Sequence, residues 1–139
     1  GSRLGQSNPA ARICVLYDVM NHLAIKGLFQ PYAESEERVV LDVLEGLELS
    51  PSLLLFDRGY PSYWLMYCLI NRQTHFVMRV PSNANRTVKA FIESDLSDIT
   101  VDIYPSYKSL AKLKQMGIWI SQTTPLKIRY HYCPVKVDK

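Results

Sequence analysis

Asp57 is the residue whose surroundings best suit chemistry. It follows an unbroken apolar run over residues 53–56, Leu-Leu-Leu-Phe, and precedes Arg58-Gly59-Tyr60. A run without alternation predicts a central strand covered on both faces, and open α/β sheets bind ligands in the crevice beyond the carboxyl ends of such strands. A carboxylate in that place needs a cation or a hydrogen-bond donor. Asp57 is therefore a candidate ligand, although an aspartate that caps the next helix, or receives Arg58 in a surface turn, explains the pattern equally.

Basic side chains offer a second kind of chemistry, the binding of phosphate. The formal charge of +3 is unevenly distributed: residues 1–80 hold seven Lys and Arg against eight Asp and Glu, whereas residues 103–139 hold seven against one. Such asymmetry suits a nucleic acid partner, although a solvated lysine face explains it as well. The guanidinium forks of Arg58 and Arg79 also match phosphate oxygens, and both residues follow predicted central elements.

Cysteine usage and length set the broad class. The three cysteines are far apart and lie among apolar or aromatic residues, which predicts reduced and mostly buried thiols. Cys133 and His131 have no second ligand pair at zinc spacing, so no structural metal is expected. No apolar run approaches the roughly 18 residues that span a bilayer, and we expect one soluble cytoplasmic domain without a membrane partner. The opening Gly1-Ser2 resembles the remnant of a tag, which suggests that the natural protein starts earlier.

The elements before residue 81 must position Asp57. Two apolar stretches predict a hairpin between residues 12 and 32, with Asn21 in the turn. Ser35 can cap a helix whose apolar positions share one face: Val39, Val40, Val43, Leu44 and Leu47. The strand that ends at Asp57 is followed by a helix with an apolar stripe: Trp64, Leu65, Cys68 and Leu69. A further strand completes a βαβ unit over residues 52–80 with parallel strands, so the fold class is α/β.

Residues 81–139 carry weaker patterns. A loop precedes a short amphipathic segment over residues 87–94, and residues 99–103 and 126–132 alternate apolar and polar side chains as half-exposed antiparallel strands do. Between these strands, apolar residues recur at the spacing of a short helix before Gly117, namely Leu110, Leu113 and Met116. A strand pair also fits that stretch.

The residues around Asp57 resemble a known motif. Residues 54–60, Leu-Leu-Phe-Asp-Arg-Gly-Tyr, followed by Ser62-Tyr63, resemble the second catalytic aspartate motif of DDE transposases, most closely in the family of insertion sequence four. Other stretches fit this family in the same order: Gln6-Ser7-Asn8-Pro9-Ala10-Ala11, Pro31-Tyr32 and Phe76-Val77-Met78-Arg79. The resemblance covers residues 5–80 and, more weakly, residues 127–132.

The resemblance implies a bacterial transposase with a ribonuclease-H-like core. Residues 1–80 would form part of that core, with the hairpin and the parallel βαβ unit in one mixed sheet. Residues 81–139 would form a mostly β insertion of the same catalytic domain, which touches the transposon end. Three carboxylates, Asp, Asp and Glu, would bind two Mg²⁺ (or Mn²⁺) ions. With these ions the transposase would cut DNA at transposon ends and join those ends to target DNA. Asp57 would be the middle carboxylate and a metal ligand, and the complete protein would act as a homodimer on paired DNA ends.

The family also implies DNA contacts. Arg79 resembles a family arginine that contacts the DNA strand near the active site, although a salt bridge to an Asp or Glu is as good an explanation. Arg58 is better explained by pairing with Asp57 or another acid. Trp119 could stack on a base flipped out near the cleavage site, although a buried core tryptophan is the favoured interpretation. Three lysines could contact phosphates or form a solvated face: Lys108, Lys112 and Lys114.

Two parts of the family pattern are missing from the sequence. The first catalytic aspartate is expected before residue 1 and the glutamate beyond Lys139, so we expect an incomplete catalytic domain that is inactive alone and binds Mg²⁺ weakly. Asp18, Asp102 and Glu93 are poor replacements, because Asp18 lies inside the hairpin and the other two lie in the insertion.

Two other classes of function stay open. One is a non-catalytic α/β module that binds DNA or protein through its basic C-terminal part. The other, with less support, is a small-molecule enzyme, since no glycine-rich phosphate loop or nucleophile-histidine pair occurs in the sequence.

Overall fold

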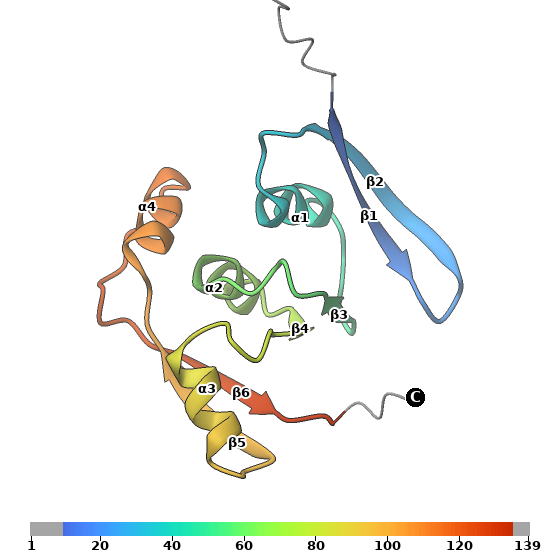
Figure 1. Ribbon diagram of the computed structural model, residues 1–139. Coiled ribbons are helices and arrows are strands. Elements are labelled where there is room, and N and C mark those ends of the chain that lie inside the picture. Colours follow the sequence, from blue (N-terminus) through green and yellow to red (C-terminus); the bar gives the residue numbers. More distant parts are fainter. Residues whose placement is uncertain (1–9, 135–139) are drawn as a thin grey trace, which may run out of the picture. The chain divides into compact units, whose positions relative to one another are not determined.

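The computed structural model describes residues 10–134 of a chain that divides into two compact units, residues 1–49 and 50–139. In the first unit, β1 (Ala11–Asp18) and β2 (Leu23–Pro31) form the predicted antiparallel hairpin, and α1 (Glu36–Leu44) packs against it (Figure 1). The turn of the hairpin places His22, rather than the predicted Asn21, in the left-handed region at a φ of 54°.

Helix α1 begins and packs as the sequence predicts. The hydroxyl of its N-cap residue, Ser35, accepts a hydrogen bond from the amide of Arg38 at 3.3 Å, which satisfies one of the free amides of the first turn. Four of the five predicted apolar positions are buried, and Leu47 is half-buried. Because strand side chains alternate between faces, the hairpin keeps a second, exposed apolar face, with Ile13, Val15 and Phe29.

The second unit opens with the predicted βαβ unit. Strands β3 (Leu53–Phe56) and β4 (His75–Met78) are parallel and are joined by α2 (Tyr63–Asn71). The predicted apolar stripe of α2 is buried, and Leu65 and Leu69 are fully enclosed. The core of this unit therefore forms around the helix that follows Asp57.

The prediction that β3 is covered on both faces is wrong. Leu54 is 7% exposed, whereas Leu55 is 63% exposed and Leu53 is exposed as well. Val77 of β4 pairs in register with Leu55 and is also exposed. Burial alternates along both strands as in a sheet covered on one side, so one face of the β3–β4 pair presents apolar side chains to solvent.

The rest of the second unit alternates helices and strands: α3 (Arg86–Glu93), β5 (Asp98–Ile103), α4 (Tyr107–Gln115) and β6 (Leu126–His131). The two strands pair antiparallel and the helix before Gly117 forms, as predicted. The expectation of a mostly β region is wrong, because side chains of Asn85 and Ser106 cap two amphipathic segments that fold as helices. Helix α3 packs on one face of the antiparallel β5–β6 pair, where the rings of Phe91 and Tyr130 lie 6.0 Å apart.

The described strands form three two-stranded sheets, and the hairpin and the parallel pair belong to different units. The single mixed sheet of a ribonuclease-H-like core therefore stays a prediction, as does the boundary at residue 80. Within residues 10–134, no helix has the length and the apolar run that crossing a bilayer requires.

Candidate active site

The strand register brings Asp57 and Arg79 together. Phe56 of β3 pairs with Met78 of β4, and the amide of Arg79 extends this ladder by donating to the carbonyl of Phe56 at 3.0 Å. The next residues along the two strands are Asp57 and Arg79, and Arg79 Nη1 lies 3.4 Å from Asp57 Oδ1. Both side chains are mostly exposed, 70% for Asp57 and 66% for Arg79. The salt-bridge explanation for Arg79 is thus confirmed, with Asp57 as its acid.

The two structural explanations for Asp57 are wrong. Its ion-pair partner within the described residues is Arg79, and Arg58, in the exposed turn, forms no ion pair there. The N-cap of α2 is Ser62, so Asp57 does not cap that helix. The turn is closed by the amide of Tyr60, which donates to the backbone carbonyl of Asp57 at 3.3 Å. This turn bond uses the backbone oxygen of Asp57 and not its carboxylate.

The chemistry of Asp57 fits one ligand of a magnesium ion. Mg²⁺ prefers carboxylate and water oxygens, and the Asp57 carboxylate is exposed at the carboxyl edge of the β3–β4 pair. Within residues 10–134, however, no group of three or more His, Cys, Asp or Glu side chains could hold a metal ion. An ion at Asp57 would therefore keep most of its water shell.

The other acids that the sequence suggested lie away from Asp57 in the chain, in the hairpin or after β4. Asp18 stabilises the hairpin turn of the first unit, where its carboxylate accepts a 2.7 Å hydrogen bond from the Asn21 side chain. The bonds from Asn21 hold the pKa of Asp18 below its ordinary value. Asp102 pairs with Lys127 at 3.2 Å, and Glu93 is the last residue of α3.

The three cysteines differ in exposure. Cys68 is buried, Cys14 is half-buried and Cys133 is exposed, so the prediction of mostly buried thiols is wrong for Cys133. Burial, followed by the negative charge of Glu36, raises the pKa of the Cys14 thiol.

A basic and aromatic surface lies on α4 and just after it. Helix α4 has no acidic residue, and its three lysines are exposed: Lys108, Lys112 and Lys114. Lys114 Nζ lies 4.7 Å from the centre of the Trp119 ring, which is a cation–π contact. Trp119 is 74% exposed, so the favoured interpretation as a core tryptophan is wrong. Lys114 and Trp119 are therefore in contact on the exposed surface, and Lys108 and Lys112 lie on the same helix as Lys114.

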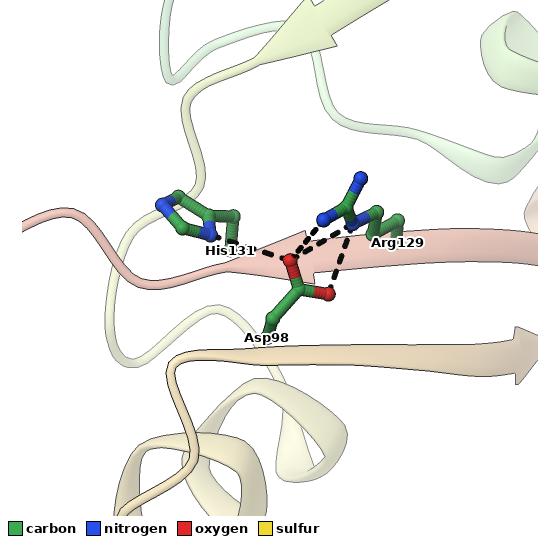
Figure 2. Close-up of polar contacts among 3 residues, drawn as sticks. All are labelled: Asp98, Arg129 and His131. Carbon is green, nitrogen blue, oxygen red and sulfur yellow. Dashed lines mark hydrogen bonds and ion pairs between the residues drawn. The ribbon is translucent and has the colours of Figure 1, made fainter.

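A second charged cluster, which the sequence analysis missed, joins β5 and β6. Figure 2 shows Asp98 between Arg129 and His131, with Arg129 Nε 2.9 Å from both carboxylate oxygens and His131 Nδ1 3.5 Å from Oδ2. The hydrogen bonds from Arg129 are the main cause that holds the pKa of Asp98 below its ordinary value, and His131 acts in the same direction. Aligning the two alternating segments would have found this cluster, since Asp98 pairs in register with His131.

Comparison with protein families gives one finding. The model of a family described as the transposase DDE domain matches residues 4–123. The match contains Asp57, Arg79, α4 and Trp119, and it ends before β6. None of the curated proteins and none of the solved structures matches the chain.

Proposed function

The chain belongs to the transposase DDE-domain family, and from this premise we propose that Asp57 is the second catalytic aspartate of a bacterial transposase of the insertion sequence four group. The family supports a general role in DNA transposition. The observation that carries the proposal is the exposed carboxylate of Asp57 at the carboxyl edge of two parallel strands, which neither caps a helix nor closes a turn.

The reaction we propose is metal-dependent cleavage of transposon ends followed by strand transfer. Two Mg²⁺ or Mn²⁺ ions, when bound, would activate the attacking oxygen and stabilise the leaving oxygen of an in-line phosphoryl displacement. Asp57 would contribute carboxylate oxygens to that site. The other two carboxylates are expected from parts of the transposase outside residues 10–134, so residues 10–134 alone would bind Mg²⁺ weakly and would not cleave DNA.

DNA is the proposed partner of the surface on α4. The three lysines would make salt-dependent contacts with phosphates, and the exposed Trp119 ring could stack on an unpaired base. Arg79 and Arg58 are proposed phosphate ligands near Asp57. The complete transposase would act as a homodimer on paired ends, in the bacterial cytoplasm where its DNA lies.

Replacing Asp57 tests the catalytic assignment. In the complete transposase with Mg²⁺, Asp57→Asn should reduce donor-end cleavage by roughly a thousandfold or more, because a lost metal ligand removes several kcal/mol of transition-state stabilisation. Asp102→Asn is the matched control, since it removes the same charge from another ion-paired carboxylate and should leave cleavage unchanged. Equal cleavage by the two variants would contradict the assignment.

Replacing Trp119 tests the DNA-binding surface. Trp119→Ala should weaken binding of single-stranded DNA by roughly fivefold to a hundredfold, the scale of one stacked base. Tyr132→Ala removes another exposed aromatic ring and should change this affinity little. Fluorescence anisotropy on both variants measures the difference, and equal losses would remove Trp119 from the proposed site.

A further inference from the structure

We propose that Arg79 exchanges partners during metal binding: it pairs with Asp57 while no cation is bound, and it turns to a DNA phosphate once a cation takes the carboxylate. The inference rests on the proposed role of Asp57 and adds a positioning role for Arg79. It also makes metal binding and phosphate binding at this edge mutually dependent.

The contact between the two side chains is weak enough to exchange. It consists of a single approach, Nη1 to Oδ1 at 3.4 Å, between two mostly exposed groups. Exposed pairs of this kind contribute little to stability. By contrast, Arg129 Nε donates hydrogen bonds to both carboxylate oxygens of Asp98 at 2.9 Å. The contact with Arg79 therefore orients the Asp57 carboxylate and still leaves it accessible to a ligand.

A cation at Asp57 would release Arg79. An Mg²⁺ ion sits about 2.1 Å from its oxygen ligands, so it would neutralise the carboxylate and repel the guanidinium. The backbone of Arg79 stays fixed by its 3.0 Å bond to the carbonyl of Phe56, so only the side chain needs to move. A guanidinium has five N–H donors in a fork that matches phosphate oxygens. The guanidinium of Arg79 would then donate hydrogen bonds to a DNA phosphate that approaches the bound ion.

Arg58 provides a matched control. It is also an exposed arginine, it adjoins Asp57 in sequence, and it makes no ion pair within the described residues. Arg58→Gln and Arg79→Gln remove the same charge from the same edge of the sheet. Only the second removes the partner that competes with a cation.

The first test is a titration of the whole chain with Mn²⁺, followed through the line broadening of the Gly59 amide by nuclear magnetic resonance. Arg79→Gln should bind Mn²⁺ about twofold to fivefold more tightly than the wild type, the scale of losing one exposed competing pair. Arg58→Gln should give a clearly smaller change. Equal changes in the two variants, or none in Arg79→Gln, would overturn the exchange.

The second test measures affinity for a short DNA duplex with and without Mg²⁺. The wild type should bind more tightly when Mg²⁺ is present. Arg58→Gln removes a proposed phosphate contact and should bind more weakly under both conditions while keeping that gain, whereas Arg79→Gln should lose most of the gain; a full gain in Arg79→Gln would overturn the exchange. Asp57→Asn separates the two proposals. If local Mn²⁺ broadening persists in Asp57→Asn, the proposed function fails; if it disappears there while Arg79→Gln behaves as Arg58→Gln, only the exchange fails.

Discussion

Two aspartate–arginine pairs join neighbouring strands of the second unit, and they differ in how completely the carboxylate is used. Both oxygens of Asp98 accept hydrogen bonds from Arg129, and His131 contacts the same carboxylate (Figure 2). The Asp98 side chain is 34% exposed. Asp57 makes one longer contact, to Arg79, and is about twice as exposed. The first carboxylate has its hydrogen-bonding capacity occupied, whereas the second keeps an oxygen open to a ligand.

The position of each pair relative to its sheet explains the difference. Asp98 and Arg129 lie within the paired segments of β5 and β6, where the antiparallel register places an acid opposite His131 and diagonal to the arginine. Asp57 and Arg79 lie one residue beyond the paired ends of β3 and β4. An ion pair between two paired strands stabilises their pairing. An ion pair at the carboxyl edge of parallel strands lies where α/β proteins bind ligands.

The largest expected effect concerns the strand that leads to Asp57. Leu54→Ala should reduce the free energy of unfolding by about 2–5 kcal/mol, because a buried leucine leaves a cavity. Leu55→Ala, one residue away on the exposed face, should change it by about 0.5 kcal/mol or less. Urea denaturation of both variants measures the contrast. Similar losses would show that the exposed face of β3 is covered in solution.

A smaller effect concerns the closed pair. Arg129→Gln should raise the pKa of Asp98 toward the ordinary aspartate value of about 3.9, since the hydrogen bonds from Arg129 are the main cause of its lowering. Because the folded pKa of Asp98 is lowered, its stabilising effect is present above the unfolded pKa and is lost as the pH falls through the folded pKa. The wild type should therefore lose more stability than Arg129→Gln below about pH 4. Carboxyl carbon shifts in a pH titration measure the pKa, and an unchanged Asp98 would contradict the pairing.

The smallest effect separates the two partners of Asp98. His131→Gln should raise the pKa of Asp98 less than Arg129→Gln does, because the histidine contact is longer and contributes less to the lowering. The same carboxyl titration measures it. A larger rise with His131→Gln would reverse the order of the two partners.

Much of the fold follows from short-range patterns. The capping residue Ser35 and the apolar face after it predicted α1, and the run before Asp57 with the stripe from Trp64 predicted the βαβ unit. The left-handed residue at His22 was missed, because propensity favours Asn21 for such angles. The exposed face of β3 does not follow from its sequence either. An apolar run shows that burial of the strand is favourable, but it does not show whether another element covers each face.

The site was predicted less completely than the fold. Asp57 stood out by its position in the chain, but its partner depends on the register of two parallel strands, which no local pattern fixes. Adjacency in sequence favours Arg58 over Arg79 as the partner of Asp57, whereas the structure pairs Asp57 with Arg79. The usual burial of tryptophan predicts Trp119 in the core, whereas the structure places its exposed ring in a cation–π contact with Lys114.

Anomalous diffraction from crystals soaked in Mn²⁺ is the sharpest test of a metal site at Asp57, because it locates the ion and the Arg79 side chain together. We expect a manganese peak at inner-sphere distance from an Asp57 carboxylate oxygen, with the guanidinium of Arg79 withdrawn from that oxygen. A peak at other residues, or an Asp57–Arg79 pair that remains intact at saturating Mn²⁺, would contradict this expectation.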